Sequence, residues 1–151
     1  MFHVALYEPE IPPNTGNVAR LCAATGATLH LIGRLGFRLD DRSLKRAGLD
    51  YWPEIEIRRH ATLAEFEAAF TGSRLFCLSR HGMIPYTAIA YQPGDCLLFG
   101  GESHGLPADV LQRHAGRVLH IPMPAGKVRS LNLATAVGIV LYEGLRQVHG
   151  W

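Results

Sequence analysis

Residues 95–107 read Asp95-Cys-Leu-Leu-Phe-Gly100-Gly-Glu-Ser-His-Gly105-Leu-Pro107. The apolar run predicts a buried strand, a glycine-rich turn follows it, and the proline marks the first turn of a helix. Similar apolar runs, bounded by Gly, Pro or Asp, predict strands at 3–7, 28–33, 54–59, 74–79 and 118–123. Helical patterns occupy 17–25, 41–47, 62–70, 107–114 and 131–148. Because strands and helices alternate, we expect an α/β fold with a mostly parallel sheet and helices on both faces.

Length and composition limit the class of protein. The 151 residues fit a single domain spanning 1–151, and 48% hydrophobic with 19% charged residues excludes an intrinsically disordered chain. The longest near-continuous apolar stretch, 134–142, is far shorter than the roughly 18 residues of a membrane helix, and no export signal is recognisable. Cys22, Cys77 and Cys96 form no C-x-x-C pair. We therefore expect a cytoplasmic protein with reduced thiols and no membrane partner.

The net charge of +2 is too small to indicate nucleic-acid binding by itself, so the local arrangement of cations matters. Arg42, Lys45 and Arg46 share one face of the predicted helix at 41–47. We interpret them as phosphate contacts, although a solvated helix face is the commoner explanation of such a run. Arg129 lies in a loop after a predicted strand, which favours a polyanionic substrate.

Ligands of open α/β sheets bind beyond the carboxyl ends of the strands, so the loops that follow strands are the candidate sites. The loop at 8–17 is stiffened by three prolines and delivers Arg20 on the first turn of the next helix. Asn14 is expected in the turn and Asn17 as the helix cap. The alternative is that both asparagines serve only the turn and the cap, and that Arg20 is a surface cation.

The loop at 100–106 excludes two familiar nucleotide sites. Leu106 and Pro107 stand where a phosphate-binding loop needs Lys followed by Ser or Thr, and Glu102 stands where a dinucleotide fingerprint needs glycine. A carboxylate at that place repels a pyrophosphate. The loop therefore predicts a neutral or cationic ligand that is approached closely by backbone N–H groups.

The loop at 121–132 leads into the last helix. Ser130 is expected to cap that helix, and Asn132 lies just inside it, where a polar side chain among apolar neighbours needs a partner. The helix is apolar on almost every side as far as Tyr142, and a chain of this length has little room to surround it. We therefore favour a homodimer with Tyr142 near the contact; a central core helix is the alternative.

Taken in order, the three loops resemble the three motifs of the SpoU/TrmH branch of the SPOUT superfamily of RNA methyltransferases. Segments 6–17 and 45–51 extend the resemblance over nearly the whole chain, toward the single-domain TrmL group that methylates the ribose of tRNA nucleotide 34. Close relatives commonly have proline and arginine where this chain has Gly101 and His104, and the connection 124–130 is one residue longer than usual. The matching residues are Asn14 and Arg20 for the first motif, Gly100-x-Glu102-x-x-Gly105-Leu106 for the second, and Ser130-Leu131-Asn132 with Ala136 and Tyr142-Glu143 for the third.

The resemblance implies a fold, a cofactor and a substrate. The C-terminal part would form a deep trefoil knot that binds S-adenosylmethionine, and no metal would be needed. The substrate would be the anticodon loop of tRNA, methylated on the wobble ribose. A homodimer would bring Arg20 of one subunit to the cofactor of its partner, with Asn14 and Glu102 completing the catalytic set. The cofactor-binding residues would be Leu78, Gly100, Glu102, Gly105, Ile121, Met123, Ser130, Leu131 and Asn132, and the RNA contacts Arg42, Lys45, Arg46 and Arg129.

Two other functions stay open. One is the same reaction on another RNA, such as ribosomal RNA, which the match at both ends of the chain disfavours. The other is a non-catalytic RNA-binding protein of the same fold, which the presence of Arg20 and Glu102 disfavours. Binding of S-adenosylmethionine discriminates between an enzyme and such a protein.

Overall fold

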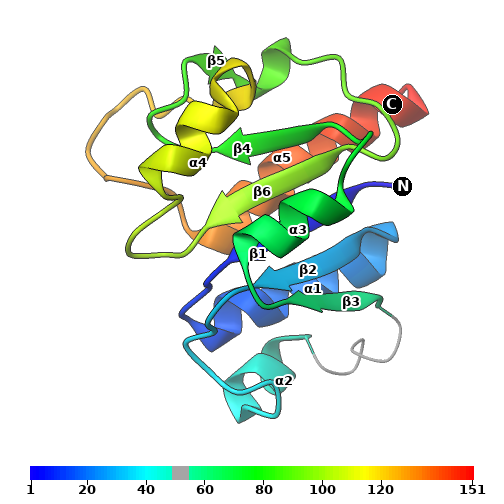
Figure 1. Ribbon diagram of the computed structural model, residues 1–151, viewed down its shortest axis with the longest axis vertical. Coiled ribbons are helices and arrows are strands. Elements are labelled where there is room, and N and C mark those ends of the chain that lie inside the picture. The colour runs from blue at the N-terminus through cyan, green and yellow to red at the C-terminus, as the bar shows by residue number, and fades with distance from the viewer. Residues whose placement is uncertain (49–54) are drawn as a thin grey trace.

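The computed structural model describes residues 1–48 and 55–151, and within them the chain forms a seven-stranded sheet (Figure 1). Every pair of neighbouring strands is parallel. The order across the sheet is β3-β2-β1-β6-β4-β7-β5. The strands are β1 (His3–Tyr7), β2 (Thr28–Ile32), β3 (Ile57–His60), β4 (Leu75–Leu78), β5 (Ile84–Pro85), β6 (Cys96–Gly100) and β7 (Val118–His120).

Helices cover both faces of this sheet. In Figure 1, α3 and α4 lie in front of it, while α1 and α5 lie behind. Phe66 of α3 and Val110 of α4 belong to the core on one face, and Val18 of α1 and Val137 of α5 to the core on the other. None of the helices in the described ranges is long and apolar enough to cross a bilayer. The helices are α1 (Pro12–Thr25), α2 (Arg42–Gly48), α3 (Leu63–Ala69), α4 (Ala108–Arg113) and α5 (Leu133–His149), with 3-10 turns η2 (Tyr86–Ala88) and η3 (Ala115–Arg117).

The predicted α/β fold with a parallel sheet is confirmed, with differences at the ends of elements. The predicted strand at 28–33 ends one residue earlier, and the one at 118–123 ends at His120 because Pro122 and Pro124 cannot continue a ladder. The strand predicted at 54–59 is found as β3, and its first position, Glu54, lies outside the described residues. The two-residue β5 was not predicted. The trefoil knot stays a prediction.

Two predicted helix caps are wrong. Helix α1 begins at Pro12, so Asn14 and Asn17 lie inside it, and its N-cap residue Ile11 makes no side-chain capping bond. Proline is tolerated there because the first N–H groups of a helix have no partner within the helix. Helix α5 is capped by Asn132, whose side chain accepts a hydrogen bond from the Thr135 N–H, and not by Ser130.

Helices α3 and α2 have local side-chain caps. The Thr62 hydroxyl accepts from the Glu65 N–H at 3.1 Å and starts α3, while the Glu65 carboxylate accepts from the Ala61 N–H. Asp41 caps α2 by accepting from the Ser43 N–H at 2.8 Å. These bonds join residues two to four positions apart, which is why a local pattern predicts them.

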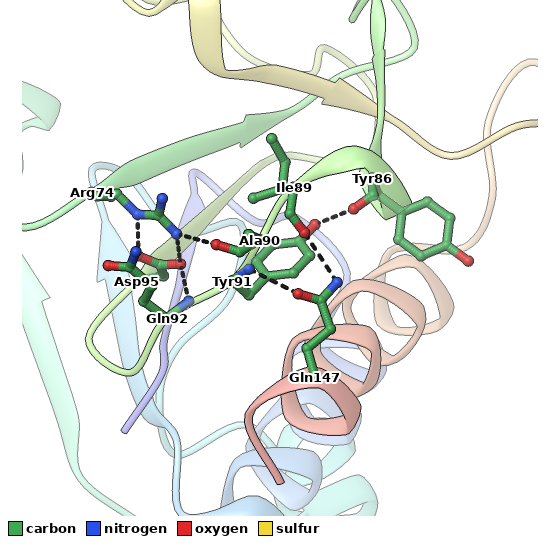
Figure 2. Close-up of polar contacts among 8 residues, drawn as sticks. All are labelled: Arg74, Tyr86, Ile89, Ala90, Tyr91, Gln92, Asp95 and Gln147. Carbon is green, nitrogen blue, oxygen red and sulfur yellow. Dashed lines mark hydrogen bonds and ion pairs between the residues drawn. The ribbon is translucent and has the colours of Figure 1, made fainter. Parts of the chain in front are cut away.

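A polar network fastens the connection that enters β6 (Figure 2). The Asp95 side chain is 3% exposed and accepts two hydrogen bonds from the Arg74 guanidinium, at 2.8 and 2.6 Å. It also accepts from the Gln92 N–H at 2.8 Å, and Arg74 donates in addition to the Ala90 carbonyl. A buried carboxylate is tolerated when it is paired and hydrogen-bonded in this way.

The same connection is tied to the last helix. Gln147 of α5 accepts from the Tyr91 N–H at 2.9 Å and donates to the Ile89 carbonyl at 3.0 Å (Figure 2). The Tyr91 hydroxyl donates to the Tyr86 carbonyl at 2.6 Å. Because this segment has little regular structure of its own, these bonds and the buried Tyr91 ring set its course over the end of α5.

Three histidines form a chain across β1, β2 and β3 on the α3 side of the sheet. His3 Nδ1 lies 2.9 Å from His30 Nε2, and His30 Nδ1 lies 2.9 Å from His60 Nε2. The His30 ring is fully buried against Phe66 and Phe70. A neutral imidazole has one donor and one acceptor nitrogen. Three neutral rings can therefore form both the His3–His30 and the His30–His60 bond, with every ring donating toward the same end of the chain.

We expect this chain to make the protein acid-labile. Burial lowers the pKa of His30 to about 3, with further lowering from His3, His60 and Arg58. Since the unfolded chain then binds more protons, stability is complete above pH ~6.5 and falls by up to about 1.4 kcal/mol for each pH unit below it. Urea unfolding at pH 7.5 and pH 5.5 measures the loss, and His30→Gln, which cannot titrate, should flatten it. An equal loss in both proteins would contradict the assignment.

Candidate functional site

A cavity of about 490 Å³ lies at the carboxyl ends of β4, β6 and β7. It is formed by the loops that follow these strands and by the start of α5. Its volume is in the range of small-molecule sites, roughly 300–1,000 Å³. All of the predicted cofactor-binding residues line it: Leu78, Gly100, Glu102, Gly105, Ile121, Met123, Ser130, Leu131 and Asn132.

The loop after β6 is a tight turn that only glycine permits. The Gly105 N–H donates to the Gly101 carbonyl at 3.0 Å, and Gly105 has a φ of +64°. A Cβ on Gly100 would overlap the Gly105 backbone, and one on Gly101 would lie 2.5 Å from the Glu8 carbonyl oxygen. The absence of side chains therefore brings backbone groups of this loop to the cavity wall.

Glu102 connects this loop to the start of α1. Its carboxylate accepts from the Glu10 N–H at 2.7 Å, the Ile11 N–H at 2.9 Å and the Asn14 side-chain amide at 3.1 Å. The negative charge thus sits where the N–H groups at a helix start need acceptors and where the helix dipole favours an anion. The missing side-chain cap of α1 is supplied by a residue about ninety positions away.

The network continues into the third loop. The Asn132 side-chain N–H donates to Asn14 Oδ1 at 2.9 Å, and Asn132 Oδ1 accepts from the Thr135 N–H at 3.1 Å. Asn132 is itself exposed, and its partner Asn14 is buried. Asn14, Glu102 and Asn132, one from each motif, form a single hydrogen-bonded network at the cavity.

Glu10 forms a second connection, which the sequence interpretation missed. Its carboxylate accepts from the Ser103 N–H at 2.9 Å and the Ser103 hydroxyl at 2.6 Å, and these bonds lower the pKa of Glu10. His104 Nε2 lies 3.4 Å from the same carboxylate, and His104 Nδ1 lies 2.9 Å from the Gly105 carbonyl oxygen. No local pattern predicts these contacts, because about ninety residues separate Glu10 from Ser103.

Apolar side chains form another part of the cavity wall. Leu78 and Phe99 lie at the ends of their strands, and Leu133 and Ala136 face the cavity from α5. Arg80, His81 and Arg129 also line the cavity; Arg80 and His81 were not predicted. The arrangement suits a ligand with an apolar or planar body that carries no phosphate on the Glu102 side.

Several predicted residues lie elsewhere. Arg20 is exposed on α1, and Arg42 and Arg46 are exposed on α2, across β1 from the cavity. None of these three arginines lines the cavity. Lys45 lies in α2, and the structure describes its backbone but not its side chain. Tyr142 is 44% exposed on α5, with its ring centroid 6.5 Å from that of Trp151.

We expect Glu102→Gln to lower the stability by about 1–2 kcal/mol. The substitution keeps the shape but replaces one acceptor oxygen by an NH₂ group that faces N–H donors, so at least one of the three hydrogen bonds of Glu102 is lost. Thermal unfolding measures the change, with Glu65→Gln as the control at an exposed carboxylate that accepts one N–H. Equal effects of the two substitutions would contradict the role given to Glu102.

Comparison with known proteins identifies similar chains. The model of the SpoU rRNA Methylase family matches residues 1–142. The tRNA (cytidine(34)-2'-O)-methyltransferase of Escherichia coli strain K12 is 48% identical over 149 residues, which cover 98% of this chain and 94% of that protein.

Solved structures show the same similarity in three dimensions. One described as "Structural insights into the 2-OH methylation of C/U34 on tRNA" has a TM-score of 0.95 and 53% identity, covering 100% of this chain and 98% of the other. The AdoMet-bound rRNA methyltransferase of Sinorhizobium meliloti has a TM-score of 0.80 and 32% identity. It is matched over 96% of this chain and 56% of its own length.

Proposed function

The chain belongs to the SpoU rRNA methylase family, and on that premise we propose that it methylates the 2′-hydroxyl of nucleotide 34, a cytidine or uridine, in the anticodon loop of tRNA. The observation that carries the proposal is the 48% identity to the Escherichia coli tRNA enzyme over nearly the full length of both chains. The rRNA-modifying relative is more distant, at 32% identity. A tRNA substrate also agrees with the expected cytoplasmic location.

S-adenosylmethionine is the methyl donor in this proposal, and the cavity is its site. The cofactor supplies a methyl group on a positively charged sulfur and carries no phosphate. The residues present fit that chemistry, since Glu102 stands where a phosphate would be repelled and Leu78, Phe99 and Leu133 give the cavity an apolar part of its wall. Gly100 and Gly105 allow backbone groups to approach a ligand closely. A family relative of known structure is AdoMet-bound, which supports the same assignment.

Arg20 acts on the RNA. A guanidinium does not act as a base in proteins, so Arg20 is not the group that accepts the hydroxyl proton. Its planar set of donors suits the ribose oxygen and the adjacent phosphate, which must be held in line with the methyl group. Glu102 and Asn14 position Arg20. Their side chains are hydrogen-bonded to each other, and Glu102 also accepts from the N–H groups at the start of α1, the helix that carries Arg20.

A homodimer completes the site. Arg20 does not line the cavity of its own chain, so in this proposal each cavity receives Arg20 from the second copy. The outer side of α5 supports this arrangement, because Tyr142 remains exposed beside the half-buried Gly138 and Ile139. Arg42, Lys45 and Arg46 of α2, together with Arg129, are the proposed contacts to the RNA backbone.

The test is methylation of tRNA that lacks ribose methylation, using labelled S-adenosylmethionine and the purified protein. Nuclease digestion and mass spectrometry then locate the methyl group. A 2′-O-methyl group on nucleotide 34 is the expected result. Cofactor binding without any mark on tRNA would move the substrate to another RNA, and no cofactor binding would indicate a non-catalytic protein.

A further inference from the structure

Five ionisable side chains line the cavity, and they divide into two sides. Glu102 and His104 lie on the β6 side, where their polar atoms already have partners in Glu10, Ile11, Asn14 and Gly105. Arg80, His81 and Arg129 lie on the side formed by the loops after β4 and β7. The second side is therefore where a further ligand group can bind.

This side of the molecule is poor in carboxylates. The sequence contains no Asp or Glu in residues 68–94 or in residues 110–142, the two segments that include the loops after β4 and β7. The cations of these loops, Arg80, Lys127 and Arg129, thus have no acidic neighbour along the chain. The local field favours an anion, although the whole chain carries a net charge of only +2.

Arg80 and Arg129 also differ from five other arginines of the fold. Arg38, Arg58, Arg74, Arg113 and Arg146 each form an ion pair with a carboxylate. Among the residues that the structure describes, no ion pair forms at Arg80 or Arg129, and both side chains are exposed. An arginine at a cavity mouth without an internal carboxylate can pair with an anionic ligand at no cost in broken bonds.

The backbone that carries Arg80 is held firmly. The Ser79 N–H donates to the Leu119 carbonyl at 2.9 Å, and the Gly82 N–H donates to the Ser79 carbonyl at 3.0 Å. The His81 N–H donates to the Ser79 hydroxyl at 3.1 Å. A Cβ on Gly82 would lie 2.5 Å from the Leu119 carbonyl carbon, so the turn packs directly on β7. Only the side chain of Arg80 must be ordered on binding, which limits the entropy cost.

We propose that Arg80 and Arg129 together bind a backbone phosphate next to the nucleotide that enters the cavity. This inference rests on the proposed function and adds Arg80 as a positioning residue. The two guanidinium groups approach from different loops, and each can donate two hydrogen bonds to phosphate oxygens. The contact holds the RNA strand so that the ribose presents its 2′-hydroxyl to the cavity.

The experiment compares Arg80→Ala, Arg129→Ala and the double variant with the parent protein. Arg117→Ala is the control, because Arg117 is an exposed arginine at the amino end of β7, whereas the cavity lies at the carboxyl ends of the strands. Affinity for unmethylated tRNA is measured across a series of salt concentrations, affinity for S-adenosylmethionine by calorimetry, and methyl transfer by KM and kcat.

Each single variant should weaken tRNA binding by about tenfold and reduce the salt slope by about 0.7–0.9. KM for tRNA should rise while kcat and cofactor affinity change by less than about twofold, and Arg80→Lys should restore most of the salt slope. Arg117→Ala should change none of these values.

Two results would overturn the phosphate contact: unchanged tRNA affinity in the double variant, or a loss confined to cofactor affinity, which would assign the arginines to the carboxylate of S-adenosylmethionine. Either could occur while the parent protein methylates nucleotide 34 normally, so the proposed function would survive. The opposite outcome is also possible: the variants bind tRNA more weakly, but the parent protein does not methylate nucleotide 34. That outcome would support the phosphate contact and reject the proposed function.

Discussion

Arg20→Ala should lower the rate of methyl transfer by at least about a hundredfold while leaving the fold and cofactor binding intact. The guanidinium is the group proposed to orient the ribose and its phosphate, and removal of one well-placed donor in an active site costs about 10²–10³ in rate. Arg20 is exposed and does not line the cavity of its own chain, so the substitution removes no packing from the core and no wall from the cavity. Single-turnover transfer, cofactor calorimetry and thermal unfolding measure the three properties.

A mixed dimer tests whether Arg20 acts across the subunit contact. Arg20→Ala is co-expressed with Ala136→Phe, a substitution that fills the cavity from a half-buried position on α5. If Arg20 acts in the partner's site, the mixed dimer has one complete site and recovers activity that neither parent variant has. If Arg20 acted within its own chain, the mixed dimer would be inactive. Arg20→Lys is the matched control for charge without the planar fork.

The second large effect concerns stability. Arg74→Ala should lower the free energy of unfolding by about 2–3 kcal/mol, because it leaves the Asp95 carboxylate, 3% exposed, with the Gln92 N–H as its remaining donor among the residues drawn in Figure 2. The Ala90 carbonyl loses its donor as well. For a chain of this length the midpoint of thermal unfolding should fall by about 5–10 °C.

Arg58→Ala is the matched control for this prediction. Arg58 also donates two hydrogen bonds to one carboxylate, through Nε at 3.0 Å and Nη2 at 2.7 Å, both to Glu56 Oε1. The side chains of Arg58 and Glu56 are each about half exposed, so the pair should contribute less than about 1 kcal/mol. Similar losses from the two substitutions would show that burial of Asp95 is not what makes Arg74 important.

The sequence was sufficient for the features that depend on local order. Apolar runs bounded by turn residues located β1, β2, β4 and β6. The three loops predicted to form the site also meet at one cavity, because the carboxyl ends of parallel strands share an edge.

The features that were missed depend on contacts between distant residues. Asn14 was expected in a turn, but it lies in α1 because Glu102 accepts the N–H groups at the start of that helix. Ser130 was expected as a cap, yet Asn132 performs that role while it also bonds to Asn14. Arg80 lacked a motif and becomes a candidate only when its loop is seen beside the cavity.

The network of Asn14, Glu102 and Asn132 has a consequence for how these residues can vary. Each of them satisfies a group on another motif, so replacing one leaves its neighbours unpaired, and replacing a second then costs less than it would alone. The three positions are therefore epistatic: their effects do not add. A lineage that loses one of them gains little by keeping the other two, and we expect the set to persist or to be replaced as a unit.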